Sequence, residues 1–361
     1  MPGEESPYTG GFSECTLIGD DYKRLCCEFE ELKRAGKIVV EAAGSQNPCT
    51  AHHWTVLKLV FLKMYVRDVY TPIIGRRYPY MVFIDLFAGR GLNAYENASF
   101  YIPGSTLIAW FYATYPFDKL YAVGYNKPRD NPEYIWLKRR LERFIPRRRL
   151  KLLIGDANKK VDDIARDLIY TRDEVKEELG GGLHYLAFID PNSHEIHWST
   201  IKKLIELEKE GISGDFIILL QARMIARVMG NIRSGKKKYH KASQELNLFF
   251  GTEEWRDFLN VKKGLEQRIL DLYIGRLRKL KSKALIERIE IELMREDIHY
   301  YLIYVTRETR GGSPYLDTVR WLESFAERVD KKTTVDNAIK DVLGIGTIKI
   351  IDFVRAQSGI S

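Results

Sequence analysis

Apolar and polar positions follow two different periods along most of this chain. Short apolar runs that end in a polar or glycine-rich turn predict buried strands, and apolar residues three or four apart predict helices. Between residues 81 and 220, strands and helices alternate, which predicts an α/β fold with a doubly wound, mostly parallel sheet. The expected strands are Met81–Phe87, Leu120–Gly124, Leu150–Ile154, Tyr185–Ile189 and Asp215–Leu220. The expected helices are Gly104–Tyr112, Pro132–Phe144, Asn158–Leu179 and Ser199–Lys209.

The segments on either side of this alternation predict additions to the core domain. We expect an N-terminal helical extension over residues 1–50, a main domain over 51–330 and a helical tail over 331–361. Residues 223–283 are basic and helical in pattern, which indicates an insertion or cap after the fifth strand. The remaining expected strands are Ala284–Leu293 and Tyr300–Thr306, a hairpin at the closing edge of the sheet. The remaining expected helices are Asp21–Ala35, Ala51–Val69 with Thr50 as its N-cap, Tyr315–Arg328, Val335–Val342 and Ile348–Arg355.

Composition adds a globular core and an anionic partner to this picture. Apolar residues make up 45% of the 361 residues, enough for a sizeable core. The net charge of +8 favours a nucleic-acid partner, although surfaces rich in Lys and Glu also occur in thermostable proteins. No apolar run approaches the roughly 18 residues of a membrane helix. The first residues lack a secretion signal, so we expect a cytoplasmic protein without membrane contact.

All four cysteines fall in the first fifty residues: Cys15, Cys26, Cys27 and Cys49. The paired C-x-x-C spacing of a metal site is missing, although His52 and His53 follow closely. We therefore expect reduced, partly buried thiols, no bound metal, and a histidine pair that caps or packs.

The loop after the first strand is the strongest candidate for ligand binding. Asp85 ends the apolar run, Phe87 follows, and Gly89 and Gly91 allow the backbone to approach a ligand closely. Asp85 either meets the amino group of a ligand or accepts N–H bonds that order the loop. No Gly-Lys-Ser or Gly-Lys-Thr follows, which argues against an ATP-binding loop.

The next two strand ends have the residues expected of an adenosine site only in part. An acid after the second strand holds ribose hydroxyls in many such sheets, but Asn126 stands there. After the third strand, Asp156 precedes Ala157 and is placed to accept from an adenine amino group. The alternative is that Asp156 or Asn158 caps the following helix.

The fourth strand end carries the candidate catalytic residues, Asp190 and Pro191. Methyltransferases that act on amino groups place an acid or amide here, then two prolines and an aromatic residue. Asn192 and Ser193 replace the second proline and the aromatic residue, so this loop is not expected to stack on a base. Asp190 is equally well read as a structural acid at the strand end, and Trp198 as a packing residue.

Two further motifs have functional readings. A Pro-Cys pair is the nucleophile of cytosine C5 chemistry, but Pro48-Cys49 precedes the glycine loop and is attributed to chance. Lys236, Lys237, Lys238, Tyr239 and Lys241 form a basic run in the insertion, next to the fifth strand end. Such a run suits a phosphate backbone, although many charge runs are only solvated faces. A second run, Arg147–Arg149, follows the Pro132–Phe144 helix.

These residues together resemble the three-Cys-motif partner proteins over about residues 50–330. The matching segments are Asp85–Gly91, Pro103–Ser105, Gly155–Asn158, Phe188–Pro191, Trp198–Leu204, Asp215–Leu220 and Phe250–Thr252 with Trp255. The resemblance implies a seven-stranded, class I methyltransferase-like sheet, S-adenosylmethionine as cofactor, and a protein partner with a three-cysteine motif. The family's usual acid corresponds to Asn126 here, and its usual Phe-Gly to Asn192-Ser193.

We therefore expect an S-adenosylmethionine-dependent methyltransferase-like protein that acts on or binds nucleic acid. Asp85, Phe87, Gly89 and Gly91 would hold the amino-acid end of the cofactor, with Asn126 at the ribose. Asp156 and Ala157 would lie at the adenine, and Asp190 would orient the methyl acceptor. The alternative is a non-catalytic module with the same fold that binds nucleic acid or a protein. A third reading is a metal-dependent hydrolase, which no tight metal spacing supports.

Overall fold

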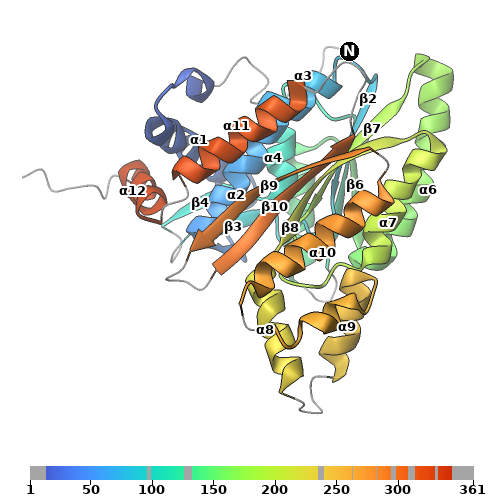
Figure 1. The fold of residues 1–361 in the computed structure, drawn as a ribbon. Helices are drawn as coiled ribbons and strands as arrows, with labels where there is room; N and C mark the ends of the chain where they lie inside the picture. Colours follow the sequence, from blue (N-terminus) through green and yellow to red (C-terminus); the bar gives the residue numbers. More distant parts are fainter. Residues whose placement is uncertain are drawn as a thin grey trace, which may run out of the picture.

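The computed structural model describes residues 14–95, 99–125, 132–234, 240–261, 263–281, 283–293, 298–307, 314–329 and 332–343. A twisted central sheet of seven strands lies between two layers of helices (Figure 1). In spatial order the strands are β6 (Leu150–Ile154), β5 (Lys119–Gly124), β2 (Tyr80–Asp85), β7 (Leu183–Ile189), β8 (Ser213–Leu220), β10 (Ile298–Arg307) and β9 (Ala284–Leu293).

The sheet is mixed, with one antiparallel strand in an otherwise parallel arrangement. The pairs β6–β5, β5–β2, β2–β7 and β7–β8 are parallel, whereas β10 runs antiparallel to both β8 and β9. The predicted hairpin at the closing edge is confirmed, and β9 has the predicted bounds. The first five strands follow the doubly wound order. Strands are added on one side of β2 as far as β6, and then on its other side, starting with β7.

Two apolar cores lie on opposite faces of the sheet, because neighbouring residues of a strand point to opposite sides. Met81 and Phe83 of β2 belong to the first core, and Val82 and Ile84 to the second. Burial on both faces explains the unbroken apolar runs in the sequence.

The helices divide between these two cores. The first core contains α1 (Asp21–Ala43), α2 (His53–Met64), the π-helical η2 (Tyr65–Tyr70), α3 (Thr71–Ile74), α4 (Ser105–Tyr112), α5 (Pro132–Phe144), α11 (Pro314–Val329) and α12 (Lys332–Leu343). The second contains α6 (Ala157–Leu179), α7 (Trp198–Glu206), α8 (Ala222–Arg233), α9 (His240–Phe250) and α10 (Leu265–Leu280).

A small second sheet, which the sequence did not predict, joins the N-terminal segment to the main domain. It contains β1 (Cys49–Ala51), β3 (Leu92–Tyr95) and β4 (Phe100–Pro103). Thr50 therefore lies in a strand and not at a helix start, and His52 is the N-cap of α2. The expected Thr50 cap is wrong because β1 pairs with β3 from a distant part of the sequence.

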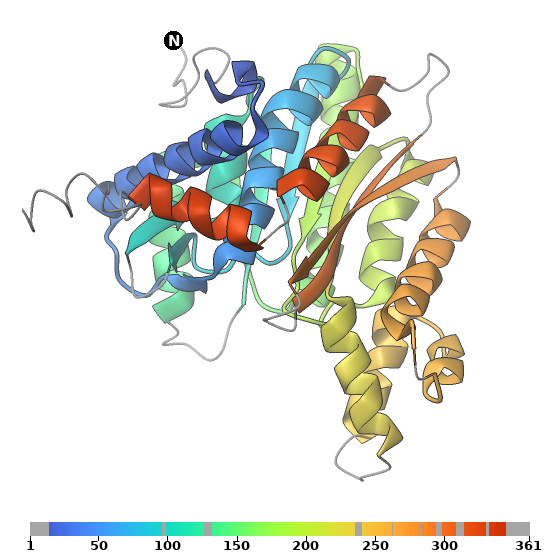
Figure 2. The ribbon, with the colours of Figure 1, turned by 60° about the vertical axis from the view of Figure 1, so that its left-hand side comes forward.

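The helix α1 is longer than predicted and packs into the main domain. It continues beyond Ala35 to Ala43, and its N-cap Asp20 accepts an N–H bond from Lys23 at 2.8 Å. A Cβ at Gly36 would overlap the backbone of Tyr101, so the glycine lets α1 lie directly against β4. Figure 2 shows α1 beside the small sheet and α12.

Buried charges also join α1 to the helix that follows it. Glu28 is fully buried and accepts two bonds from Arg67, at 2.7 and 3.1 Å, while Lys63 lies 2.7 Å from the same carboxylate. Glu31 pairs with Lys63 as well. Burial alone would raise the pKa of Glu28, but the charges of Lys63 and Arg67 outweigh burial and lower it to about 2.

The insertion after the fifth strand and the C-terminal helices are helical as predicted. The insertion contains α8, α9, a short 3-10 helix η5 (Glu254–Phe258) and α10, and α8 and α9 project beyond the sheet (Figures 1 and 2). In the tail, α12 packs against α1, where Tyr22 donates to Asp341 at 2.7 Å. The expected helix over residues 348–355 lies outside the described residues, and the division into three parts stays a prediction.

The cysteine prediction is wrong for two of the four residues. Cys15 lies in a short 3-10 helix, η1 (Glu14–Leu17), and forms a disulfide with Cys27 of α1. The chain brings the two Cα atoms to 5.5 Å, within the range that a disulfide requires. Cys26 and Cys49 are free thiols.

Among the residues that the structure describes, none of the helices combines the length and apolar character needed to cross a bilayer.

Candidate functional site

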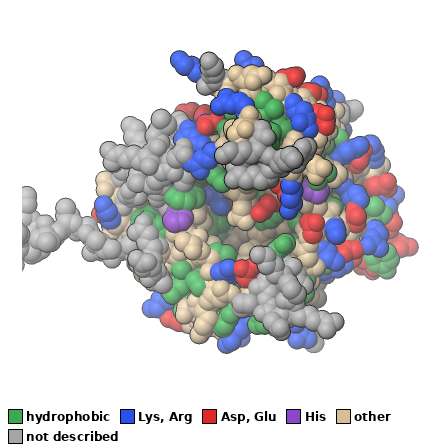
Figure 3. All heavy atoms as spheres, turned by 90° about the horizontal axis from the view of Figure 1, so that it is seen from below, with side chains coloured by type: hydrophobic (Ala, Val, Ile, Leu, Met, Phe, Trp, Pro, Cys, Tyr) green, Lys and Arg blue, Asp and Glu red, His purple; other side chains and the backbone are tan. Residues whose placement is uncertain are grey.

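The candidate site lies at the carboxyl edge of the parallel strands, between β2 and β7, where the order of the strands switches from one side of the sheet to the other. Ligands in doubly wound sheets bind at such a point, because the connections diverge there and leave a crevice. The helix α8 leaves this edge directly after β8 and runs downward in Figure 1. Figure 3 views the molecule from that side, and its face is hollowed near the centre.

The loop after β2 contains two glycines in the left-handed region of the backbone. Gly89 and Gly91 have φ angles of +58° and +72°, which residues with a Cβ rarely adopt. The backbone at Gly104, just before α4, passes directly against the loop. A Cβ on Gly104 would lie 2.8 Å from the Cα of Gly91. Gly89 is exposed at the carboxyl edge, so its backbone is accessible to a ligand.

Asp85 orders this loop from beneath and is fully buried. Its carboxylate accepts hydrogen bonds from Ser105 Oγ at 2.5 Å, Thr106 Oγ1 at 2.7 Å and the Phe87 N–H at 3.2 Å. Burial raises the pKa of Asp85 to about 6; the nearby charge of Asp190 adds to this effect, and the three hydrogen bonds oppose it. The geometry matches the loop-ordering role and not direct contact with a ligand's amino group.

Asp190 follows β7 and pairs with Lys58, which the sequence did not single out. The Nζ of Lys58 lies 2.5 Å from Oδ2 of Asp190, and the two side chains are 13% and 18% exposed. Lys58 comes from α2, so the helix before the sheet contributes to the site. Pro191 is buried, and its carbonyl accepts from Gln221 at 3.1 Å. Asp190 and Asp85 thus lie at the ends of neighbouring strands, and Lys58 pairs with Asp190.

The loop that follows Asp190 is held mainly by its own contacts and by the insertion. The N–H of Asn192 donates to Glu195 at 3.2 Å, and His194 lies 3.3 Å from Glu245 of α9. Trp198 is 6% exposed and packs edge-on against Tyr273, as the packing interpretation predicted.

The adenosine-side residues are only partly described. Asp156 is exposed and accepts the N–H of Asn158 at 2.9 Å, so it caps α6 as the alternative reading expected. Ala157 follows it and is nearly buried at the first position of α6. Asn126 lies outside the described residues. Tyr125 before it, at the end of β5, is 60% exposed.

Of the predicted nucleic-acid residues, the structure describes Lys241. It is exposed on α9, and its Nζ lies 3.6 Å from Glu245. Lys236–Tyr239 lie outside the described residues, between α8 and α9. Arg147–Arg149 precede β6 and therefore lie at the opposite, amino edge of the sheet.

Two arginines hold an N-terminal segment against the glycine loop, an arrangement that the sequence did not predict. Arg90 donates to the Pro48 carbonyl at 2.8 Å, and Arg140 donates to the carbonyls of Arg90 at 2.7 Å and Gly44 at 3.3 Å. Arg140 is fully buried.

Cys49 of this segment lies beside Gly89, with its sulfur 3.2 Å from the place a Cβ on Gly89 would take. Burial raises the pKa of the Cys49 thiol, which does not suit a nucleophile at neutral pH.

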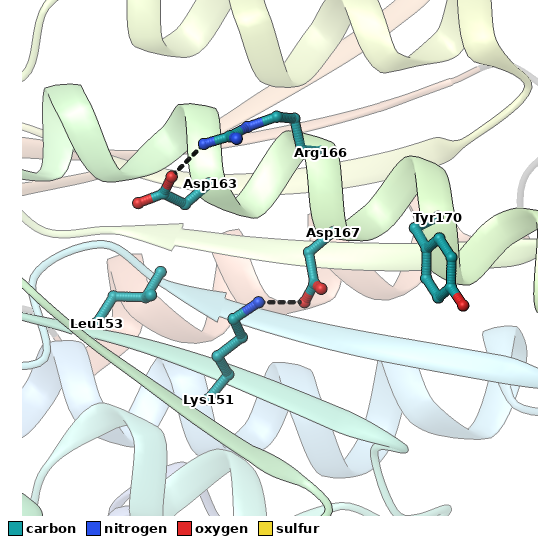
Figure 4. Close-up of a pocket in the computed structure, with 6 residues that line it drawn as sticks. All are labelled: Lys151, Leu153, Asp163, Arg166, Asp167 and Tyr170. Atoms are coloured by element: carbon teal, nitrogen blue, oxygen red, sulfur yellow. Dashed lines mark hydrogen bonds and ion pairs between the residues drawn. The ribbon is translucent and has the colours of Figure 1, made fainter.

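A metal site is not found at this edge among the described residues. In the part of the chain that the structure describes, potential metal ligands are grouped at Cys15, Cys27 and Glu31 of η1 and α1, and the two cysteines are joined to each other. An open groove between β6 and α6 also lies away from the site (Figure 4). Its charges are paired internally, since Lys151 lies 2.9 Å from Asp167, and Asp163 lies 2.5 Å from Arg166. A lysine on an edge strand protects the edge against pairing with another chain.

Comparisons with known proteins do not decide the family. No family model matches the chain, and no curated protein matches it. Among solved structures, protein LPL1258 from Legionella pneumophila shares 14% identity over 73% of this chain and 91% of that one, with a TM-score of 0.40.

An O-methyltransferase from Bacillus cereus, solved with SAH, shares 8% identity over 77% of this chain and 100% of that one, with a TM-score of 0.33. Cofactor-bound Rv0187 from MTB shares 12% identity over 82% and 94%, with a TM-score of 0.32. At these values the likenesses carry no argument, and the fold rests on the strand order itself.

Proposed function

We propose that the protein is an S-adenosylmethionine-dependent methyltransferase that acts on nucleic acid. The observation that carries this proposal is the glycine loop beside Asp85 and Asp190, at the point between β2 and β7 where the order of the strands switches. The seven strands and the helical insertion after the fifth agree with the fold that the resemblance to three-Cys-motif partner proteins implies.

The residues present fit such a cofactor. Gly89 is exposed in a loop whose positive φ angles favour glycine, so the backbone there can approach the amino-acid end of the cofactor. Asp156 is exposed after the end of β6 and would lie on the adenine side. When bound, the cofactor supplies an electrophilic methyl group, so the protein's task is to position the acceptor.

Calorimetric titration with S-adenosylmethionine and its demethylated product tests the proposal. We expect the Gly89→Ala variant to bind at least about tenfold more weakly, because alanine disfavours the φ of +58° and its Cβ would lie 3.2 Å from the Cys49 sulfur, so the loop must shift. Gly211→Ala is the matched control: Gly211 also has a positive φ, +75°, but lies in open space before β8. If the unaltered, folded protein binds neither compound at millimolar concentration, the cofactor proposal is wrong.

The nucleic-acid part of the proposal is supported by charge. The chain carries a net charge of +8, and Lys236–Lys238 lie in the sequence between α8 and α9, the helices that project from the candidate edge. Changing Lys236 and Lys237 to Gln should make the slope of the logarithm of the binding constant against the logarithm of salt concentration shallower by about two. Changing the exposed Arg147 and Arg148 to Gln removes the same charge at the opposite edge and should leave the salt dependence unchanged.

A second candidate function is a non-catalytic module that binds nucleic acid or a protein with a three-cysteine motif. It is favoured by Asp156, which caps a helix, and by the exposed Asn192 in place of a proline. This reading predicts binding that survives Asp190→Ala without change. A methylation signal that this substitution abolishes would exclude it.

A further inference from the structure

The Lys58–Asp190 pair presents both a donor and an acceptor to whatever enters the site. One oxygen of Asp190 already accepts from Lys58 at 2.5 Å. The ammonium of a lysine has three donors, and a carboxylate has a second oxygen, so each partner keeps capacity for another bond. The side chains are 13% and 18% exposed, so the pair is largely shielded from water but still accessible.

A hydroxyl group matches this pair, and an aromatic amino group does not. A hydroxyl donates one hydrogen bond and accepts others through its oxygen, whereas a nucleobase NH₂ acts as a donor and cannot accept from a lysine. Lys58 would also oppose the positive charge that develops on a nitrogen as it gains a methyl group. The same charge would stabilise the negative charge that develops on an oxygen.

The loop after Asp190 agrees with this reading. An enzyme that methylates a base amine requires the base to be held, usually by stacking on an aromatic ring. Asn192 is exposed, and Ser193 bonds to His194 at 3.0 Å, so these two positions offer no aromatic surface.

We propose that the methyl acceptor is a ribose 2′-hydroxyl of RNA, held between Asp190 and Lys58. This inference rests on the proposed function and adds the acceptor atom to it. Within a nucleic-acid strand, the 2′-hydroxyl is the group that both donates and accepts, and it distinguishes RNA from DNA.

The step balances with these two residues. The acceptor oxygen forms a bond to the methyl carbon, and the carbon–sulfur bond breaks with its electron pair left on sulfur. The hydroxyl proton passes to the free oxygen of Asp190 and then to solvent. Lys58 keeps its proton throughout and donates to the reacting oxygen.

The first experiment identifies the methylated atom. A pool of unmodified RNA transcripts and DNA of the same sequences would be incubated with the full chain and radiolabelled S-adenosylmethionine, then digested to nucleosides. We expect label in 2′-O-methyl nucleosides from RNA and none from DNA. Label on a base overturns the inference but leaves the proposed function standing. No label in RNA, from protein shown by calorimetry to bind the cofactor, also overturns it.

The second experiment tests the roles of the pair. Lys58→Met should lower kcat at least about 100-fold with little change in KM or in cofactor affinity, since it removes a charge needed in the transition state. Lys58→Arg retains the charge and should recover part of the activity. The control is Lys151→Met, which breaks a similar pair with Asp167 at the far edge. Equal activity of Lys58→Met and Lys151→Met would refute the assignment.

Cofactor titration separates the two proposals. If neither S-adenosylmethionine nor its product binds, the proposed function fails, and the acceptor assignment fails with it. If both bind and the label is found on a base, only the acceptor assignment fails.

Discussion

The substitution Glu28→Gln tests whether α1 is a structural part of the main domain. Glu28 is fully buried between α1 and α2 and forms ion pairs with Lys63 and Arg67. Glutamine keeps the shape of the side chain but removes the charge, so two cations would remain buried with less compensation. Breaking a buried ion pair by removing one partner costs about 3–5 kcal/mol.

The lowered pKa of Glu28 gives a similar estimate of its contribution to the free energy of unfolding. The pKa falls from 4.5 to about 2 on folding, and each unit corresponds to about 1.4 kcal/mol, so the ionised carboxylate contributes about 3 kcal/mol. Because the folded pKa is lowered, this contribution is complete above pH 4.5 and is lost as the pH falls toward 2. The variant should therefore differ most from the native protein near neutral pH.

The assay is urea unfolding followed by tryptophan fluorescence and circular dichroism, at pH 7 and at pH 3.5. Glu41→Gln is the control on the same helix, because the Lys37–Glu41 pair is 3.8 Å long and its side chains are 77% and 62% exposed. That variant should stay within about 0.5 kcal/mol of the native protein. A loss below about 1 kcal/mol for Glu28→Gln at pH 7, or an equal loss at both pH values, would refute the reasoning.

Three further outcomes follow from other buried groups. Asp85→Asn should raise the free energy of unfolding by up to about 3 kcal/mol at pH 7.5 and leave it unchanged near pH 4. The folded pKa of Asp85 is raised to about 6, so its ionisation costs stability as the pH rises through that window; a lower stability at pH 7.5 would contradict this. Arg140→Met should release the N-terminal segment and expose the Cys49 thiol, which a thiol reagent would then modify at least about tenfold faster in the folded protein. An unchanged rate would show that Arg140 does not hold this segment. Gly251→Ala should cost about 1–3 kcal/mol in thermal unfolding, because its Cβ would lie 2.5 Å from the Trp198 ring at a φ of +63°; an unchanged melting temperature would contradict the packing.

The alternation of strands and helices could be predicted because its determinants are local. The helix Pro132–Phe144 and the strands Leu150–Ile154 and Ala284–Leu293 have the predicted bounds. In each case the apolar period and the flanking residues belong to the segment itself. The small sheet was missed because its strands are three or four residues long and depend on pairing between distant parts of the chain, as between Cys49 and Asn93.

Within the candidate site, the sequence identified the residues that the backbone requires. It singles out Gly89 and Gly91 as glycines that allow close backbone approach, and both have positive φ angles. The sequence allows two roles for Asp85, and its complete burial beneath the loop favours the structural one.

The sequence by itself determined the order of the strands along the chain, the glycine loop and the helical insertion, because a strand, a tight turn or a helix depends on neighbouring residues. Tertiary structure alone decided which side chains meet. Lys58 and Asp190 are 132 positions apart, and Arg140 reaches a segment 96 positions away. Contacts of this kind depend on how the layers pack, and no local pattern records them. The electrostatics of the site therefore belong to the folded molecule.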